Sequence, residues 1–500
     1  MIMQQRYRAR TTTGCLTCRK RRKKCNEDKP ICIGCKRNHL ICTWPTDGKT
    51  KQDVSLVRAP AGQNLSTDTD VAVIPAHASR QNGGANAQIK MIYSTLSVPP
   101  SIDLMPGLRK ESDRHMFEHY MNVTALKLAG RHEPQNAFLS HIIPIAYQDA
   151  RVVQSVLAIS GAQLCFRSDQ FEHPARSHYA VTLRSVKHSL LDWRALGTVE
   201  LTGLLTMTLF LCMFEIVIGN IDGNFLHHVR ASRTLLLELR YYRANQVDRC
   251  TLDLLTEFYA FFAINTNITL TNDLPINRYM PEDPFLSPKS LAELNKGTSI
   301  YGVLFGSAHE LVGLIMPIAR SARYFLEHQN TEQRNINLRK YEREILAWKH
   351  KPLHSSSEAQ SDGPDPYEAA GQLWQQSILV FLYTTFNGRN PPSPELIAKV
   401  DACIEAAFLV TSTIPLNHSI KTTLPWPGLI CASCMLNPIY RDMIKGVMSV
   451  SETDVAMLSV NRNFEFMLKL WEEQDLDDRV YGPYGIELVM RKYNFNLCVS

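Results

Sequence analysis

The sequence predicts a mostly α-helical chain with a small cysteine-rich unit at its N-terminus, a flexible linker and a large all-α domain. Three observations carry this prediction. Six of the 13 cysteines fall within residues 15–42. A polar stretch containing Gly, Asn, Gln, Ser and Thr follows and ends near Pro99 and Pro100, which is typical of a linker. From residue 102 onward, apolar residues recur at helical spacing. With 500 residues, of which 45% are hydrophobic, the chain is too long for one core and too apolar to be disordered throughout.

Charge is distributed unevenly along the chain. Residues 1–50 carry 13 Lys or Arg and three acidic residues, a net charge of +10, and the overall charge of +6 leaves −4 for the other 450 residues. A basic end joined to a mildly acidic body is typical of a nucleic-acid-binding module attached to a second domain. The N-terminal residues lack the apolar segment of a signal peptide, so we expect neither secretion nor disulfides.

One apolar run, residues 201–218, is the only candidate for a membrane span. Glu200 and Glu215 enclose 14 uncharged residues. A bilayer needs ~20 mostly apolar residues, so this run predicts a buried helix, and no membrane association is expected.

The six clustered cysteines form an internal repeat. Each half reads C-x2-C-x6-C, and a six-residue connection containing Pro30 joins the halves. Two thiolates separated by two residues can reach one metal ion from a single turn, and zinc takes four such ligands. Six ligands suffice for two zinc ions only if two thiolates bridge, and the first cysteine of each half is the natural bridge. The predicted ligands are Cys15, Cys18, Cys25, Cys32, Cys35 and Cys42, with Cys15 and Cys32 bridging two zinc ions.

Six consecutive basic residues lie between the second and third cysteines. They are Arg19, Lys20, Arg21, Arg22, Lys23 and Lys24. Six thiolates around two zinc ions leave a charge of −2, which these side chains offset. Because the run is held on a folded cluster, we expect it to bind double-stranded DNA. A solvated face or a nuclear-import signal is the alternative interpretation, and the nucleus is the expected location in either case.

The cysteine spacing, Pro30 and the basic run resemble the fungal-type Zn2Cys6 binuclear cluster transcription factors. The resemblance covers residues 15–42 and implies the same bridging cysteines. It also implies that a short helix in the first half enters the DNA major groove, typically at CGG triplets. That family usually reads these bases with two lysines, where this chain has Arg21 and Arg22. Arginine pairs bidentately with guanine, so base reading is expected to persist, while the other four basic residues contact phosphates or neutralise the cluster.

The body of the chain, residues 106–500, predicts an all-α domain. Leu183, Val186 and Leu190 illustrate its helical periodicity, proline occurs where helices must end, and clear strand alternation is absent from the sequence. Residues 351–367 are predicted to form a disordered internal loop.

A second resemblance extends over this body. Residues 136–139 (NAFL), 157–162 (LAISGA) and 424–427 (LPWP) are similar to the helical regulatory domain that often follows Zn2Cys6 clusters. This resemblance implies a helical region that tunes activity. The transcription machinery or coregulators, and a small-molecule effector, are the partners expected for it.

Two features of the body could be mistaken for sites. Cys431 and Cys434 have metal or redox spacing, but no second pair or histidine lies nearby, so they are expected to be buried thiols. Glu215 stands alone in an apolar helix, and a buried carboxylate needs a partner. Arg230 or Arg233 is expected to supply it, with contact to an effector as the alternative.

These observations predict a zinc-dependent, sequence-specific DNA-binding regulator of RNA polymerase II transcription. No enzymatic activity is expected, because the sequence lacks P-loop, G-x-S-x-G, H-E-x-x-H and G-x-G-x-x-G motifs. The alternatives are a basic protein that senses or buffers metal, and an RNA-binding protein. The predicted organisation is a DNA-binding domain over residues 1–47, a disordered linker over residues 48–105 and the regulatory domain over residues 106–500. The linker holds no apolar heptads, so the sequence leaves open whether the protein is a monomer or a homodimer.

Overall fold

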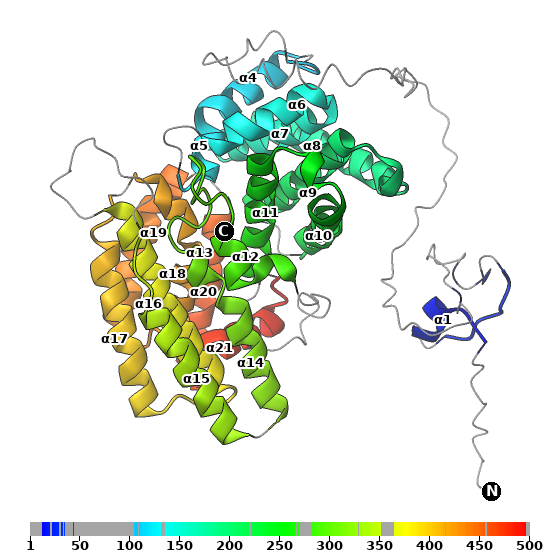
Figure 1. Ribbon diagram of the computed structural model, residues 1–500. Coiled ribbons are helices and arrows are strands. Elements are labelled where there is room, and N and C mark those ends of the chain that lie inside the picture. Colours follow the sequence, from blue (N-terminus) through cyan, green and yellow to red (C-terminus); the bar gives the residue numbers. More distant parts are fainter. Residues whose placement is uncertain are drawn as a thin grey trace, which may run out of the picture. The chain divides into compact units, whose positions relative to one another are not determined.

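In the computed structural model the chain divides into two compact units, residues 1–97 and 98–500, and each is described by itself (Figure 1). The structure describes the following residues: 13–20, 23–29, 32, 33, 35 and 44 in the first unit, and 105–108, 110–131, 136–219, 222–266, 268–270, 283–328, 330–351, 365–415, 417–455 and 458–496 in the second. Every regular element within these ranges is a helix, which confirms the predicted fold class.

Several sequence-based predictions fall outside the described residues. They are those for Arg21, Arg22, Cys42, residues 48–104 of the predicted linker and residues 352–364 of the predicted internal loop.

The first unit contains the short helix α1 (Leu16–Lys20). The α-helices of the second unit are α4 (Glu111–His119), α5 (Ala125–Leu128), α6 (Ile143–Gln148), α7 (Ala150–Cys165), α8 (Glu172–Ser189), α9 (Thr198–Val217), α10 (Phe225–Tyr242), α11 (Arg249–Asn265), α12 (Pro288–Ala292), α13 (His309–Val312), α14 (Ile315–Glu327), α15 (Thr331–Leu346), α16 (Pro366–Asn387), α17 (Pro394–Thr411), α18 (Pro425–Ala432), α19 (Pro438–Val455), α20 (Leu458–Gln474) and α21 (Gly482–Tyr493). Two π-helical turns, η2 (Tyr120–Thr124) and η3 (Phe138–Ile142), and five short 3₁₀ helices complete the described elements: η4 (Asp169–Phe171), η5 (Trp193–Ala195), η6 (Ala244–Gln246), η7 (Pro284–Leu286) and η8 (Ser419–Thr423).

Helix α9 is the central helix of the first half of the body. It contacts α6, α7, α8, α10 and α11, and also α20 from the C-terminal region (Figure 1). Every residue from Leu201 to Val217 is buried. By length and composition α9 could cross a membrane, but 89% of its most apolar window is buried inside the protein. The prediction of a buried helix at residues 201–218 is therefore confirmed.

The polar side chains of α9 named below have hydrogen-bond partners on α9 itself or on the neighbouring helix α8. The hydroxyl of Thr206 donates to the carbonyl of Thr202 at 2.9 Å, as buried threonines in helices commonly do. The hydroxyl of Tyr179, on α8, donates to the carboxylate of Glu215. Arg233, one of the two arginines expected beside Glu215, forms an ion pair with Asp283, with Nε 3.2 Å from Oδ2. Tyr179 is thus a partner of Glu215 that sequence analysis did not predict.

Helix α16 occupies the corresponding central position in the second half of the body. It contacts α13, α14, α15, α17, α18 and α21. Trp374 of α16 stacks on Trp426 of α18, with ring centroids 5.3 Å apart and planes inclined by 13°. Cys431 lies 3.3 Å from the hydroxyl of Ser377 on α16, and burial raises the pKa of Cys431 to about 12. Cys434 is also buried, so the prediction of buried thiols is confirmed.

Side-chain caps and prolines start the long helices. Asp365 accepts the backbone N–H of Tyr367, and Pro366 is the first residue of α16. Ser393 caps α17 in the same way, ahead of Pro394. These residues satisfy N–H groups that a helix leaves free at its start, and proline has no N–H to satisfy there.

The packing of α9 generates a stability prediction. Phe210 on α9 is 1% exposed and lies against the rings of Tyr120 and Phe258, with centroids 6.4 and 5.9 Å away. Phe210→Ala is expected to lower the free energy of unfolding of the body by about 3–5 kcal/mol, because it leaves a cavity. Urea denaturation followed by circular dichroism measures this change.

The matched control is Leu191→Ala, since Leu191 is 76% exposed. It is expected to change the free energy of unfolding by less than about 0.5 kcal/mol. Equal transition midpoints for the two variants would contradict the central position of α9.

Candidate metal centre and nucleic-acid interface

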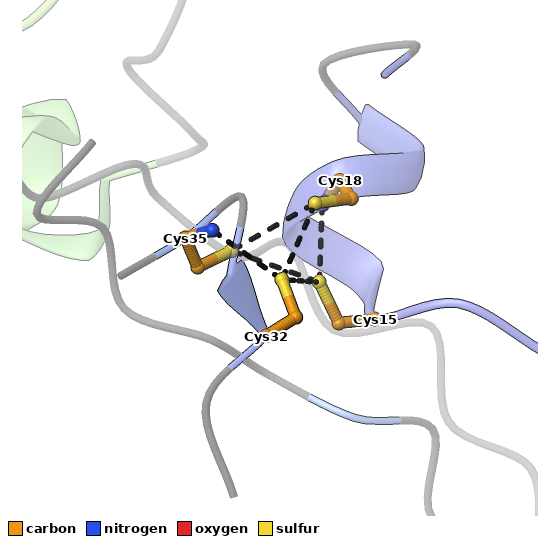
Figure 2. A group of neighbouring side chains, drawn as sticks. All are labelled: Cys15, Cys18, Cys32 and Cys35. Atoms are coloured by element: carbon orange, nitrogen blue, oxygen red, sulfur yellow. Dashed lines mark hydrogen bonds between the residues drawn. The ribbon is translucent and has the colours of Figure 1, made fainter. Parts of the chain in front are cut away.

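Four of the six predicted ligands meet in the first unit (Figure 2). The Sγ atoms of Cys15, Cys18, Cys32 and Cys35 all lie within 4.8 Å of one another, and all four residues are buried. Cys15 directly precedes α1 and Cys18 lies within it, so one turn of helix presents both thiols on the same side. Cys32 and Cys35 approach from the second half of the repeat (Figure 2).

The separations between these sulfurs fit zinc. Sγ of Cys15 lies 3.7 Å from both Cys32 and Cys35, and Sγ of Cys18 lies 3.6 Å from Cys32 and 3.9 Å from Cys35. In a tetrahedral site with Zn–S bonds near 2.3 Å, two sulfurs are about 3.8 Å apart. The four sulfurs are therefore spaced as ligands of one zinc ion, and a cluster that divides Cys18 and Cys35 between two ions requires these two sulfurs to move apart.

The fifth predicted ligand lies next to the first. Cys25 is buried, and its sulfur accepts the backbone N–H of Cys15 at 3.4 Å. The sixth, Cys42, lies outside the described residues.

The two halves of the repeat share one local geometry. The N–H of Cys18 donates to Sγ of Cys15, and the N–H of Cys35 donates to Sγ of Cys32, both at 3.3 Å. Burial opposes ionisation of Cys32, but the Cys35 N–H and the neighbouring thiols outweigh it and lower the pKa of Cys32 to about 6. Burial raises the pKa of Cys18, so this thiol is expected to release its proton when metal binds. The thiolate form of Cys32, which binds metal, is thus favoured at neutral pH.

Residues without a ligand role also shape the cluster, and sequence reasoning missed them. A Cβ on Gly14 would lie 2.8 Å from the Cβ of Cys25, so only glycine fits beside this ligand. The side chain of Asn26 accepts the N–H of Ile33 at 2.8 Å and so joins the two halves. Glu27 adopts a φ of 65°, which bends the chain after the third cysteine. Glycine and asparagine beside the cysteines, both typical of tight turns, were the available signal.

The core of the described part of this unit consists of predicted zinc ligands. In the described part of residues 1–97, the buried hydrophobic residues are all cysteines, with Trp44 packed against them. Nζ of Lys29 lies 5.4 Å from the centre of the Trp44 ring. So few apolar contacts cannot offset the entropy of ordering the chain, and zinc ligation is expected to supply the folding energy.

The basic run begins on the helix that carries the first two ligands. Arg19 on α1 and Lys23 and Lys24 beyond it are exposed, and Lys20 is the last residue of α1. The N–H of Lys23 donates to the carbonyl of Cys18 at 3.0 Å, which holds this segment close to the cluster. Arg21 and Arg22, the predicted base readers, lie outside the described residues. Contact between this run and DNA stays a prediction.

Two family models match the chain. The fungal Zn(2)-Cys(6) binuclear cluster domain matches residues 13–52, and the fungal specific transcription factor domain matches residues 115–498. The second match covers more than half of the chain, so the protein belongs to the fungal zinc-cluster transcription factors. Their family is one of transcription regulators and not of enzymes. The binuclear cluster of the family and the sulfur geometry agree on zinc as the metal.

Several curated proteins are similar to parts of the chain. Transcriptional activator protein UGA3 of Saccharomyces cerevisiae is 26% identical over 161 residues, which are 31% of this chain and 30% of that protein. Transcription factor lfc1 of Flammulina velutipes is 28% identical over 116 residues, 21% of this chain and 41% of that protein. White-opaque regulator 2 of Candida albicans is 60% identical over 62 residues, 12% of each protein. The chain thus matches less than half the length of each of these relatives. No solved structure matches it.

The close approach at Gly14 generates a prediction for metal binding. Gly14→Ala forces its new Cβ against Cys25, so this ligand must shift. Zinc affinity, measured by competition with a chromogenic chelator, is expected to fall roughly tenfold or more, as for other residues that support metal ligands.

Ile33→Ala is the control, because this side chain is 61% exposed and its backbone N–H is retained. Its zinc affinity is expected to equal that of the unaltered protein. If Gly14→Ala binds zinc as tightly as Ile33→Ala does, the packing described around Cys25 is wrong.

Proposed function

We propose that this protein is a zinc-dependent, sequence-specific DNA-binding regulator of RNA polymerase II transcription that acts in the nucleus. The observation that carries the proposal is the convergence of four buried thiols beside a helix that carries the exposed Arg19, with Lys23 and Lys24 exposed just beyond it. A protein that merely buffers metal has no need of such a helix. Membership of the fungal zinc-cluster transcription factors supports the same function.

In the proposed cluster, two zinc ions share Cys15 and Cys32. One ion is also bound by Cys18 and Cys25, and the other by Cys35 and Cys42. The equivalent N–H···S bonds to the two bridging sulfurs support this assignment, because they stabilise negative charge at corresponding positions of the repeat.

Within the basic run, two residues are proposed to contact DNA bases and the other four to contact phosphates or the cluster. Arg21 and Arg22 pair with guanines of a CGG-type site in the major groove. Arg19, Lys20, Lys23 and Lys24 contact phosphates or offset the charge of the cluster. The exposure of Arg19, Lys23 and Lys24 supports this role.

The proposed function assigns a role to each of three parts of the chain. Residues 1–47 form the DNA-binding domain, residues 48–105 link it to the body, and residues 106–500 form the regulatory domain. The match of residues 115–498 to the fungal specific transcription factor domain supports this regulatory role, with coregulators or the transcription machinery as the proposed partners.

Bridging by Cys15 generates a test of stoichiometry. Cys15→Ala removes a ligand from both zinc ions and is expected to release both, whereas Cys18→Ala is expected to leave mainly one. Native mass spectrometry counts the ions directly. Two zinc ions per chain in the Cys15→Ala protein would exclude this cysteine as a bridge.

The roles within the basic run generate a test of specificity. Loss of a bidentate arginine–guanine pair costs ~1–3 kcal/mol of discrimination. Arg22→Ala is therefore expected to lower the ratio of affinities for a CGG-containing and a scrambled duplex by about tenfold.

Lys23→Ala is the matched comparison, since a phosphate contact does not depend on sequence. It is expected to weaken both duplexes alike and to reduce the slope of log K against log salt by roughly one. Titrations of both duplexes at two salt concentrations measure these effects. An unchanged affinity ratio for Arg22→Ala would place base reading in other residues.

A further inference from the structure

Thr13 lies two residues before Cys15, the first predicted zinc ligand, and its side chain is exposed. Its hydroxyl donates to Oε1 of Glu27 at 2.7 Å. Glu27 in turn donates its backbone N–H to Sγ of Cys25 at 3.4 Å. The Thr13 hydroxyl is therefore accessible from solvent, and a single residue connects it to another predicted zinc ligand.

Arginines precede Thr13 at a regular spacing. Arg8 and Arg10 stand five and three residues before it, in the sequence RARTTT. Both arginines lie outside the described residues. Protein kinases select their substrates partly by charge, and arginines at these two positions fit the acidic subsites of kinases that recognise Arg-x-Arg-x-x-Thr. The pattern indicates a phosphorylation site at Thr13.

The same spacing occurs once more in the N-terminal residues, where Arg6 and Arg8 precede Thr11. Thr11 lies outside the described residues. Thr13 is the threonine with a described contact to the turn that carries Cys25. A modification of Thr13 can therefore act directly on the cluster.

We propose that a basophilic protein kinase phosphorylates Thr13 and that the phosphate weakens DNA binding. In this reaction Oγ1 of Thr13 bonds to the γ-phosphorus of ATP, the bond from that phosphorus to the bridging oxygen breaks, and ADP leaves. The hydroxyl proton passes to the catalytic carboxylate of the kinase. This inference rests on the DNA-binding function proposed above.

Phosphorylation replaces a hydrogen-bond donor with an anion beside Glu27. Phosphothreonine carries a charge of about −1.5 to −2 at pH 7, and next to an acidic side chain it acts by repulsion. The Thr13 Oγ1 atom also loses the proton that it now donates to Glu27. The contact between the N-terminal side of the cluster and the turn after Cys25 is therefore expected to open.

The same phosphate opposes DNA through its charge. Residues 1–50 carry a net charge of +10, from 13 basic and three acidic residues, and a dianion lowers it to about +8. Thr13 belongs to the same small unit as the exposed Arg19, Lys23 and Lys24. Because the attraction between basic side chains and DNA phosphates does not depend on base sequence, binding to every duplex is expected to weaken alike.

The full-length protein is the sample for the test. It is treated with ATP and purified protein kinase B, a kinase that recognises Arg-x-Arg-x-x-Thr, and tandem mass spectrometry locates the phosphate, which is expected on Thr13. Affinities for a CGG-containing and a scrambled duplex are then measured at two salt concentrations. Both are expected to fall roughly tenfold at the lower salt concentration, with their ratio unchanged and the slope of log K against log salt reduced by about one to two.

Substitutions separate the two threonines and test the role of Glu27. After treatment, the Thr13→Ala protein is expected to keep the DNA affinity of the untreated protein, and the Thr11→Ala protein is expected to show the full loss. Thr13→Glu adds a negative charge without a kinase, so it is expected to lower both affinities by a smaller factor. Adding Glu27→Gln is expected to lessen that loss, because a neutral side chain then faces the new charge.

Three results would overturn the proposal: no phosphate on Thr13, unchanged affinity for both duplexes when Thr13 is phosphorylated, or an equal loss of affinity in the treated Thr13→Ala protein. The untreated protein distinguishes this inference from the function on which it rests. If it binds the CGG-containing duplex and phosphorylation has no effect, this inference alone is wrong. If the untreated protein binds neither duplex, the proposed function is wrong.

Discussion

The convergence of cysteine sulfurs is the interaction on which the N-terminal unit depends. Ordering the backbone costs about 1–2 kcal/mol per residue. The described part of this unit has only buried cysteines and a half-buried Trp44 to offset that cost. Zinc ligation must supply the difference, and it also fixes the helix on which Arg19 lies relative to both halves of the repeat. The positions of the basic side chains, and hence any reading of DNA, therefore follow from the metal.

The body is stabilised by a different interaction, which is the packing of apolar helices. Helices α9 and α16 are each surrounded by neighbours, and the contact of α9 with α20 connects the first half of the body to its C-terminal region.

Sequence reasoning succeeded where the determining information is local. The C-x2-C spacing places Cys15 and Cys18 on one helical turn, so their shared site could be predicted, and the apolar run of α9 identified a core helix. Sequence reasoning failed where the role of a residue depends on contacts between segments that are distant in the sequence. Gly14 is required because Cys25 passes close to it, and Tyr179 contacts Glu215 from a neighbouring helix. Gly371 of α16 is likewise required because the indole of Trp348 lies against it, where a Cβ would be only 2.3 Å from Cη2, and no local pattern reveals this contact.

X-ray absorption at the zinc edge of the full-length protein tests the central claim most directly. A cluster of six cysteines and two ions requires a first shell of sulfur alone, with Zn–S distances near ~2.3 Å. Bridging by Cys15 and Cys32 further requires scattering from a second zinc ion in the next shell. Nitrogen or oxygen ligands in the first shell, or the absence of zinc–zinc scattering from a fully loaded sample, would contradict the account.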